Sequence, residues 1–570
     1  MTRHSLSAAL AASKVLASVA LLGAVLLGNP LTPAAVHAAT IAIVNNDGPN
    51  EGFNDPTAAA PVGGNPGTTI GAQRLFVFQR AAAIWGTLLK STTEIRVNAQ
   101  FNPLTCDAVS GVLGSAGPTT VHRDFAGALF SGTWYHQALA NKLAGADLSA
   151  AQNDINATFN SSVGTATCLT VGWYYGIDGN EGNQIELFPV VLHEIGHGLG
   201  FSTTTNGQTG VFLNSFPHVW DHFLFDPSVG LHWNEMNNTQ RAASAVSCGS
   251  LVWDGALVTS RAPSYLAPGP NLHVNAPPLA AGDYEVGQAS FGAPLSESGV
   301  TGDVALANDG VGVVTNACEP LVNDVAGKIV LLDRGGCTFV IKVKNAQNAG
   351  AIGVVVADSI PGCPPAGLGG TDPTITIPSV RVSQSDGTFL KANLSGMNTT
   401  LLLDPAKRAG ADAAGRALMY APNPYTPGSS VSHWDVSAEP NLLMEPGINS
   451  SLSSDTDLTM QLYGDIGWVG PSSAVADASE AQGIQFSLAQ NRPNPGSAFT
   501  NVRFSIPARE RVVLRVFDVN GRLLLTPVDA ILDPGPHAAR ILTSSLAGGV
   551  YFYRLEAGEK SLSRRFAVLP

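Results

Sequence analysis

Residues 190–203 read VVLHEIGHGLGFST and contain two histidines four positions apart, His193 and His197. On a helix, residues at this spacing project from the same face, so both imidazoles can reach one metal ion. Glu194 follows the first histidine and is placed to bond a water molecule at that ion instead of the ion itself. The stretch therefore predicts a helix that carries two metal ligands and a general base for hydrolysis.

The helix is expected to end near Gly198 and Gly200, because glycine readily adopts the left-handed turn that closes many helices. A catalytic zinc site usually needs a third protein ligand. Thr203 stands three residues after Gly200, but threonine does not normally bind zinc. Rival ligands lie nearby in an aromatic stretch that is also typical of simple packing: His218, Asp221, His222, Asp226, His232 and Glu235.

A second stretch, GSSVSHWDVSAEPNLLMEP at residues 428–446, places His433 before a tryptophan and Met444 further on. The HExxHxxG pattern resembles the metzincin metalloproteases, and the HW histidine followed by a methionine resembles their leishmanolysin branch. By this resemblance His433 is the third ligand and Zn²⁺ is the cofactor. The resemblance also implies that Glu194 is the catalytic base and that Met444 lies in a turn beneath the metal.

His433 lies 236 residues after His197 (433 − 197). This separation is compatible with one site, because the entropy of closing a loop grows only logarithmically with its length. Much of the intervening chain is also expected to be a folded unit whose two ends lie close together.

The central part of the chain contains short β-like runs. VAGKIVLLDRGGCTF at residues 325–339 is followed by an expected helix at 342–350 and a buried strand at 351–358. The strand, the RG-C-F turn, the helix ending in AGA and the apolar strand resemble a protease-associated (PA) domain. We therefore predict a PA domain at residues 271–404, inserted into a catalytic domain formed by residues 39–270 and 405–470.

The C-terminal part resembles the sorting domain of type IX secretion cargo, an immunoglobulin-like β-sandwich. The resemblance depends on QNRPNP at 490–495, on Asn520-Gly521 in a predicted hairpin, and on GVYFYRL at 549–555. It implies export by the type IX secretion machinery. We predict a linker at 471–484 and this sandwich at 485–570.

The first residues predict a signal peptide. Two basic residues lead into an apolar run at 15–27, and a cleavage point is expected before Ala39, so residues 1–38 are predicted to be removed. No later stretch is apolar enough to cross a bilayer. The net charge of −13 argues against nucleic acid as a partner. We therefore expect a protein exported through the periplasm of a Gram-negative-type bacterium, to the cell surface or beyond.

Export makes the six cysteines candidates for disulfide bonds. We expect Cys106 to pair with Cys168, and Cys318 with Cys337. Cys248 and Cys363 are then left either to pair with each other or to remain free.

The remaining pattern predicts an α+β catalytic domain. The segment at 72–86 has helical periodicity, with Phe76, Ala83 and Ile84 or Trp85 near one stripe, and residues 94–101 alternate as a half-buried strand does. Asp455 and Asp457 could bind Ca²⁺, but carboxylates at this position are also typical of a helix N-terminus.

The sequence thus predicts a secreted zinc endopeptidase that acts on polypeptides. The alternative is a surface or adhesive binding protein that has kept the scaffold of a metalloprotease and lost its activity. Its support is Thr203, which stands where most metzincins have a histidine, together with two modules that carry no chemistry of their own.

Overall fold

The computed structural model describes residues 38–447, 456–468, 486–491, 494, 499–506, 508–532, 535–543, 546–558 and 560–568. Apart from Ala38, the predicted signal peptide lies outside these residues, and so does the predicted linker. Among the residues described, no helix combines the length and the apolar character that crossing a membrane requires.

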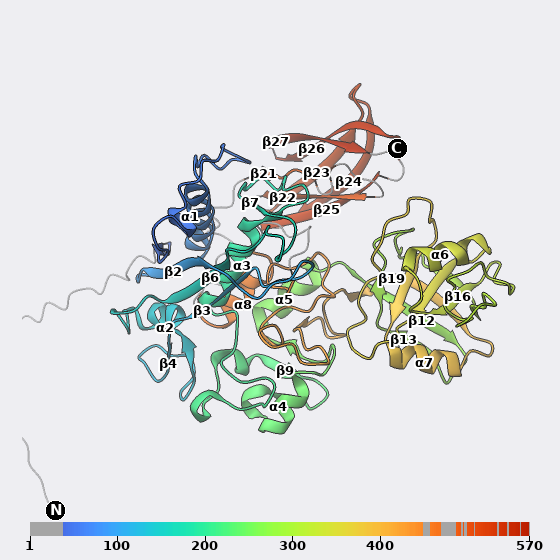
Figure 1. Cartoon of the computed structure of the whole chain (residues 1–570), viewed down its shortest axis with the longest axis horizontal. Helices are drawn as coiled ribbons and strands as arrows, with labels where there is room; N and C mark the ends of the chain where they lie inside the picture. Colours follow the sequence, from blue (N-terminus) through green and yellow to red (C-terminus); the bar gives the residue numbers. More distant parts are fainter. Residues whose placement is uncertain are drawn as a thin grey trace, which may run out of the picture.

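A four-stranded mixed sheet forms the N-terminal part, in the order β1 (Ile41–Asn45), β2 (Ile95–Asn102), β6 (Ile155–Asn160), β3 (Gly114–Pro118). The first three strands are parallel, whereas β3 is antiparallel to β6 and forms one edge of the sheet. Helix α1 (Ile70–Leu88) packs on β1, and α3 (Leu187–Leu199) packs on β3 and β6 (Figure 1). The predicted helix at 72–86 and strand at 94–101 are therefore confirmed as α1 and β2.

The buried face of α1 differs from the predicted stripe. Phe78, Ala81 and Trp85 are fully buried, whereas Phe76 is only half-buried and Ala83 is exposed. Apolar residues occur all around this helix, so periodicity alone could not select the buried side. The contact with α3 selects it instead, since the Trp85 indole N–H donates to the Leu192 carbonyl at 3.0 Å.

One hydrophobic core joins two segments that are far apart in the sequence. It includes Leu139 and Leu199 from the first segment and Trp434, Leu462 and Trp468 from the last. We call the residues around this core, 39–266 and 409–468, the main domain. Its other elements are β4 (Val121–His122), β5 (Tyr135–His136), α2 (Gln137–Ala144), β7 (Trp173–Tyr174), β8 (Ile185–Glu186), β9 (Leu224–Asp226), β10 (Leu231–His232), α4 (Asn238–Ser244), β11 (Val252–Trp253), α5 (Ala256–Tyr265), β20 (Ala417–Leu418) and α8 (Thr459–Asp465), with 3-10 turns at 52–54, 213–215, 219–222 and 233–235.

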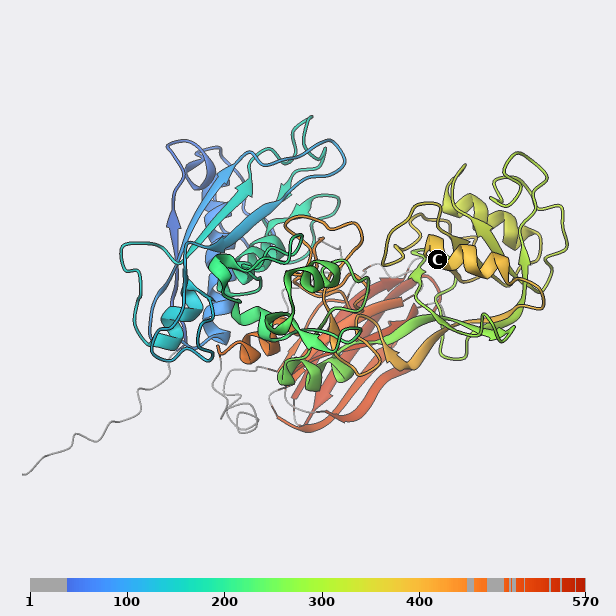
Figure 2. The same ribbon diagram turned by 90° about the horizontal axis from the view of Figure 1, so that it is seen from below.

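Residues between these two segments form a separate lobe (Figure 2). Its eight-stranded sheet has the order β13 (Gly282–Tyr284), β12 (Pro268–Ala276), β19 (Asn398–Arg408), β15 (Val300–Leu306), β16 (Ile329–Asp333), β17 (Gly353–Ala357), β18 (Ser379–Val382), β14 (Gly287–Gln288), with helices α6 (Phe339–Asn348) and α7 (Gln384–Ala392). The first long strand, β12, pairs antiparallel with the last, β19, so the chain leaves the main domain and returns to it side by side. The long sequence separation is thus closed by one strand pair.

The C-terminal residues form two sheets around a hydrophobic core of their own. One has the order β21 (Ser487–Leu488), β22 (Phe499–Ile506), β25 (Gly535–Leu542), and the other β24 (Leu523–Leu532), β23 (Glu510–Phe517), β26 (Gly549–Ala557), β27 (Lys560–Val568). Buried side chains of both sheets meet in one cluster, as in a sandwich. The predicted turn at Asn520-Gly521 connects β23 to β24, and Gly521 has a φ of 78° there.

All six cysteines are paired. Cys106–Cys168 and Cys318–Cys337 confirm the two predicted bonds, and Cys248 pairs with Cys363. This third bond joins the main domain to the inserted lobe.

Candidate metal centre

Helix α3 is buried along almost its whole length, and its glycines allow close approach of its neighbours. A Cβ atom at Gly196 would lie 2.9 Å from the Met444 sulfur, and one at Gly198 would lie 2.3 Å from the Ile155 side chain. The helix ends at Gly200, whose φ of 133° lies in the region that favours glycine. The spacing of the motif thus combines two histidines on one face with glycines that let the helix sit deep in the core.

Three imidazole rings meet at one end of this helix, and each is held by a backbone carbonyl. Nδ1 of His193 lies 2.7 Å from the Leu443 oxygen, Nδ1 of His197 lies 2.7 Å from the Phe201 oxygen, and Nδ1 of His433 lies 2.8 Å from the Ser429 oxygen. A carbonyl only accepts hydrogen bonds, so each Nδ1 carries the proton and each Nε2 presents a lone pair.

The three Nε2 atoms face one another. His197 Nε2 lies 3.0 Å from that of His193 and 3.1 Å from that of His433, and one ligand atom from each ring falls within a span of 4.8 Å. Unprotonated nitrogens repel at this range unless a cation lies between them. Three nitrogens bound tetrahedrally to Zn²⁺ lie about 3.3 Å apart, so the donor set fits this ion.

The electrostatics favour the neutral, metal-binding form of each ring. Burial lowers the pKa of His193 to about 4 and that of His433 to about 3. Burial, together with the two neighbouring imidazoles, also holds the pKa of His197 well below its usual value. Neutral imidazole is the form that coordinates metal ions.

Glu194 lines the same cleft as the three histidines. Burial raises the pKa of its carboxyl to about 8, against the opposing effect of the Ala116 backbone N–H on β3. The side chain packs against β3 where Gly114 leaves room, since a Cβ there would lie 2.8 Å from Glu194 Cγ. A divalent cation beside this carboxyl would favour its ionised form.

Met444 is fully buried against α3 at Gly196. The turn that carries it supports the imidazoles through its backbone: the Leu443 carbonyl accepts from His193, and the Met444 carbonyl accepts from the Trp434 N–H at 2.8 Å. Met444 thus lies in a turn that contacts both α3 and His193, and its place beneath a bound metal stays a prediction.

Sequence reasoning named Asp457 but missed that this residue holds the turn. Its carboxylate accepts a short hydrogen bond from the Leu443 N–H and two more from Thr459, at 3.0 and 2.9 Å. These protein donors occupy the carboxylate that the sequence offers as a Ca²⁺ ligand, and Asp455 lies outside the described residues. The predicted place of Asp457 at a helix N-terminus agrees with its bond to the N–H of Thr459, the first residue of α8, whereas its bond to the Leu443 N–H gave no signal in the sequence.

Thr203 has a structural role instead of a metal-binding one. Its hydroxyl donates to Asp221 at 2.7 Å, and the Thr205 hydroxyl and the His218 N–H donate to the same buried carboxylate. The two segments are thereby joined just beyond the end of α3.

The rival ligands do not reach the three imidazoles. His218 accepts from the Trp220 N–H, His222 contacts the Thr133 hydroxyl at 3.1 Å, and Glu235 accepts from the His232 N–H. Within the described part of the chain, His193, His197 and His433 are the single group of three or more such side chains close enough to share an ion.

The histidines open into a cleft of about 620 Å³. One wall consists of residues 111–116, which include the start of the edge strand β3, and the other of Tyr425 and residues 427–433. An extended chain could lie along β3 and pass over the three imidazoles.

Two families match parts of the chain. Residues 298–390 match the PA domain, and residues 492–569 match the secretion system C-terminal sorting domain. The predicted PA and sorting modules are therefore confirmed, and the second match indicates export by the type IX secretion system.

Similar proteins share only part of their length with this chain. Vacuolar-sorting receptor 1 of Pisum sativum is 31% identical over 140 residues, which are 22% of this chain and 22% of the receptor. Minor extracellular protease Vpr of Bacillus subtilis is 34% identical over 93 residues, 16% of this chain and 11% of the protease. A receptor and a protease thus share segments with this chain, so the similarity indicates a common module and not a common activity.

Among solved structures, a zinc aminopeptidase from Bacillus subtilis matches the chain at 26% sequence identity. The matched region covers 26% of this chain and 36% of the aminopeptidase, with a TM-score of 0.19. That score is too low to indicate a shared overall fold.

Proposed function

We propose that this protein is an exported, zinc-dependent endopeptidase of the metzincin type, with His193, His197 and His433 as the metal ligands. The observation that carries the proposal is the convergence of three unprotonated imidazole nitrogens beside a buried carboxyl, in a cleft bordered by an edge strand. The histidine-only donor set, its geometry and the open cleft favour Zn²⁺ over harder ions, which prefer oxygen ligands.

When bound, Zn²⁺ supplies Lewis acidity, which polarises the peptide carbonyl and lowers the pKa of water. The Glu194 carboxylate takes the proton of the attacking water and later gives a proton to the amide nitrogen that leaves. The carbonyls of Leu443, Phe201 and Ser429 keep the imidazoles in the tautomer that binds metal.

Substrate is expected to lie in an extended conformation along β3, where the unpaired edge of the strand can form backbone hydrogen bonds. Internal cleavage is favoured because the described lining offers no lysine or arginine to hold a free carboxylate. The carboxylates there are Glu194 and Glu445, and the latter already accepts from the Leu442 N–H at 2.7 Å.

The test is to compare the wild type with Glu194→Gln for zinc content by atomic absorption and for hydrolysis of casein. We expect one zinc per chain in both proteins and a loss of activity of about 10²- to 10⁴-fold in the variant. Glu235→Gln, a change of the same type outside the cleft, should retain full activity. Zinc in the wild type without hydrolysis that depends on Glu194 would overturn the proposal and favour the binding protein.

A further inference from the structure

The loop before β3 can contact a substrate through a side chain, whereas the strand can contact it through backbone groups. We call residues 104–112 the rim loop. Its last two residues, Gly111 and Val112, line the cleft beside the first residues of β3. The loop therefore borders the path of any chain that lies along the edge strand.

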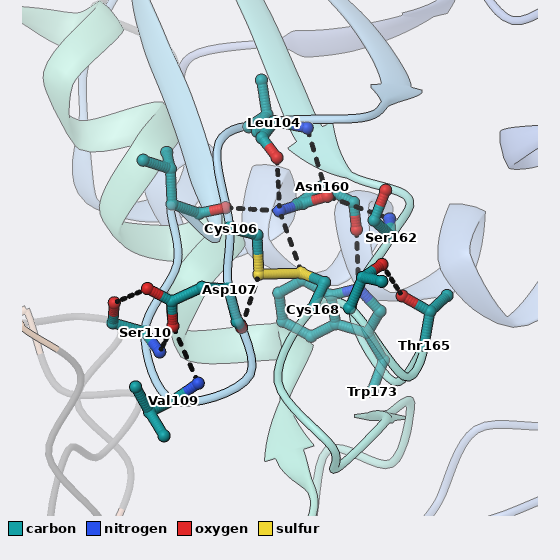
Figure 3. The surroundings of a disulfide bond; sticks show 12 residues. Leu104, Cys106, Asp107, Val109, Ser110, Asn160, Ser162, Thr165, Cys168 and Trp173 are labelled. Carbon is teal, nitrogen blue, oxygen red and sulfur yellow. Dashed lines mark hydrogen bonds between the residues drawn. A yellow bond between two sulfur atoms is a disulfide. The ribbon is translucent and has the colours of Figure 1, made fainter.

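The rim loop is fixed from several sides. The Cys106–Cys168 bond ties it to the segment after β6, and the Asp107 carboxylate accepts from the N–H groups of Val109 and Ser110 at 2.8 and 2.7 Å (Figure 3). The buried Asn160 side chain bonds both ends of the loop: it donates to the Val112 carbonyl at 2.8 Å and accepts from the Leu104 N–H at 3.2 Å.

A cleft wall held in this way is organised before a ligand arrives, which reduces the entropy lost on binding. Gly111 shows how tightly the loop is folded, because a Cβ there would lie 2.4 Å from the Cys106 sulfur.

Both backbone groups of Val112 are already used inside the protein. Its N–H donates to the Thr105 carbonyl at 2.9 Å, and its carbonyl accepts from Asn160. Only the side chain, which is 44% exposed, is left to contact a substrate. Strand β3 can pair with any extended backbone, so it does not discriminate between substrate sequences. At Val112, by contrast, recognition depends on the side chain of the substrate.

We propose that Val112 is a specificity-determining residue that selects an apolar side chain of the polypeptide substrate. This inference rests on the proposed function. Val112 faces the cleft with a hydrocarbon surface, and no cationic side chain lies among the described lining residues to compensate an acidic group of the substrate. An acidic side chain at this subsite would lose water without gaining a partner.

The rim loop also provides a matched control. Val109 belongs to the same loop and is 88% exposed, but it does not line the cleft. Val112→Lys and Val109→Lys therefore introduce the same charge a few residues apart, one inside the predicted subsite and one outside it. Both side chains are exposed enough to be replaced without disturbing the core.

The experiment compares the cleavage sites that the zinc-loaded wild type and the two variants select in a mixed peptide library, identified by mass spectrometry. Val112→Lys should raise the use of Asp and Glu relative to Leu and Val at one subsite by about tenfold or more. Val109→Lys should leave the wild-type preference unchanged. The inference is overturned if Val112→Lys alters no subsite more than Val109→Lys does.

A binding measurement separates this inference from the proposed function. In a zinc-loaded Glu194→Gln background, fluorescein-labelled decapeptides that carry Leu or Glu at each position in turn are titrated with each rim variant. The same reversal of preference, seen in the ratio of Kd values, supports the role of Val112 even if the wild type hydrolyses nothing. An unchanged ratio, beside active wild-type hydrolysis, overturns the role of Val112 and leaves the peptidase standing.

Discussion

The two segments that supply the imidazoles are held in different ways. His193 and His197 lie on a buried helix, so their separation follows from helical geometry alone. His433 lies in a loop, and its position depends on contacts with Tyr420, Ser429 and the turn at Met444. Two of the three ligands are therefore positioned by local sequence, whereas the third is positioned by the fold of the whole main domain.

The largest expected effect comes from removing the remote ligand. His433→Ala should weaken zinc binding by about 3 kcal/mol or more, roughly a hundredfold, because a ligand of a site worth about 10 kcal/mol or more is lost. Competition with a zinc chelator measures this change. His222→Ala is the control and should keep wild-type zinc affinity. If His433→Ala bound zinc tightly and His222→Ala bound it weakly, the third ligand would be His222 instead of His433.

The second prediction concerns the anchor of the His433 segment. Cys248 is bonded to Cys363 of the inserted lobe, and Cys363 also pairs with Asn423, close before the cleft wall. Replacing Cys248 and Cys363 by serine should lower the free energy of unfolding by about 2–4 kcal/mol and also speed the release of zinc to a chelator.

The same double replacement at Cys106 and Cys168 provides the contrast. It should lower stability by a comparable amount but leave zinc release unchanged, since this bond holds the rim loop and no ligand. Equal release rates in the two double variants would show that the inserted lobe does not stabilise the His433 segment.

A smaller effect is expected at Asp457, which fixes the backbone of Leu443 and so the ring of His193. Asp457→Asn should weaken zinc binding about 10- to 100-fold, the range typical of residues that orient a ligand. Asp465→Asn is a suitable control because Asp465 is on α8 and bonds Trp253 and Leu257 away from the imidazoles. A similar loss of zinc in both variants would point to general loosening of α8.

The smallest effect is expected at the end of the helix. Thr203→Val keeps the volume of the side chain but removes its hydrogen bond to Asp221, which should reduce stability by about 1 kcal/mol in urea unfolding. Zinc affinity should not change. Thr87→Val, on the exposed surface of α1, is the control and should leave stability unchanged. A loss of zinc affinity in Thr203→Val would show that Thr203 takes part in metal binding.

The parts of this site that sequence could predict are those with a short-range signal. Four-residue spacing identified His193 and His197, and the family resemblance suggested His433 and Met444. The carbonyls that orient the rings gave no signal, because any residue at positions 201, 429 or 443 supplies one. Asp457 was correctly placed at a helix N-terminus, where it accepts from the Thr459 N–H, but its second partner, the Leu443 N–H, is defined only by tertiary structure.

The fold shows the same division. The strand β2, the helix α1 and the hairpin at Asn520-Gly521 follow from periodicity and turn chemistry. The buried face of α1 did not, because a helix that is apolar all around can bury either side, and its neighbours decide. The pairing of β12 with β19 could not be predicted from local patterns either, although it is what brings His433 back to the helix.

The position of His433 after the inserted lobe determines when the centre becomes complete. Until strand β19 has returned beside β12, only the two imidazoles on α3 are in place, and the third ligand is not held beside them. If the protein has the proposed peptidase activity, a copy in which this strand pairing has not yet formed should be inactive toward the proteins around it. Destructive chemistry would then begin only when the last stretch of the main domain is in place.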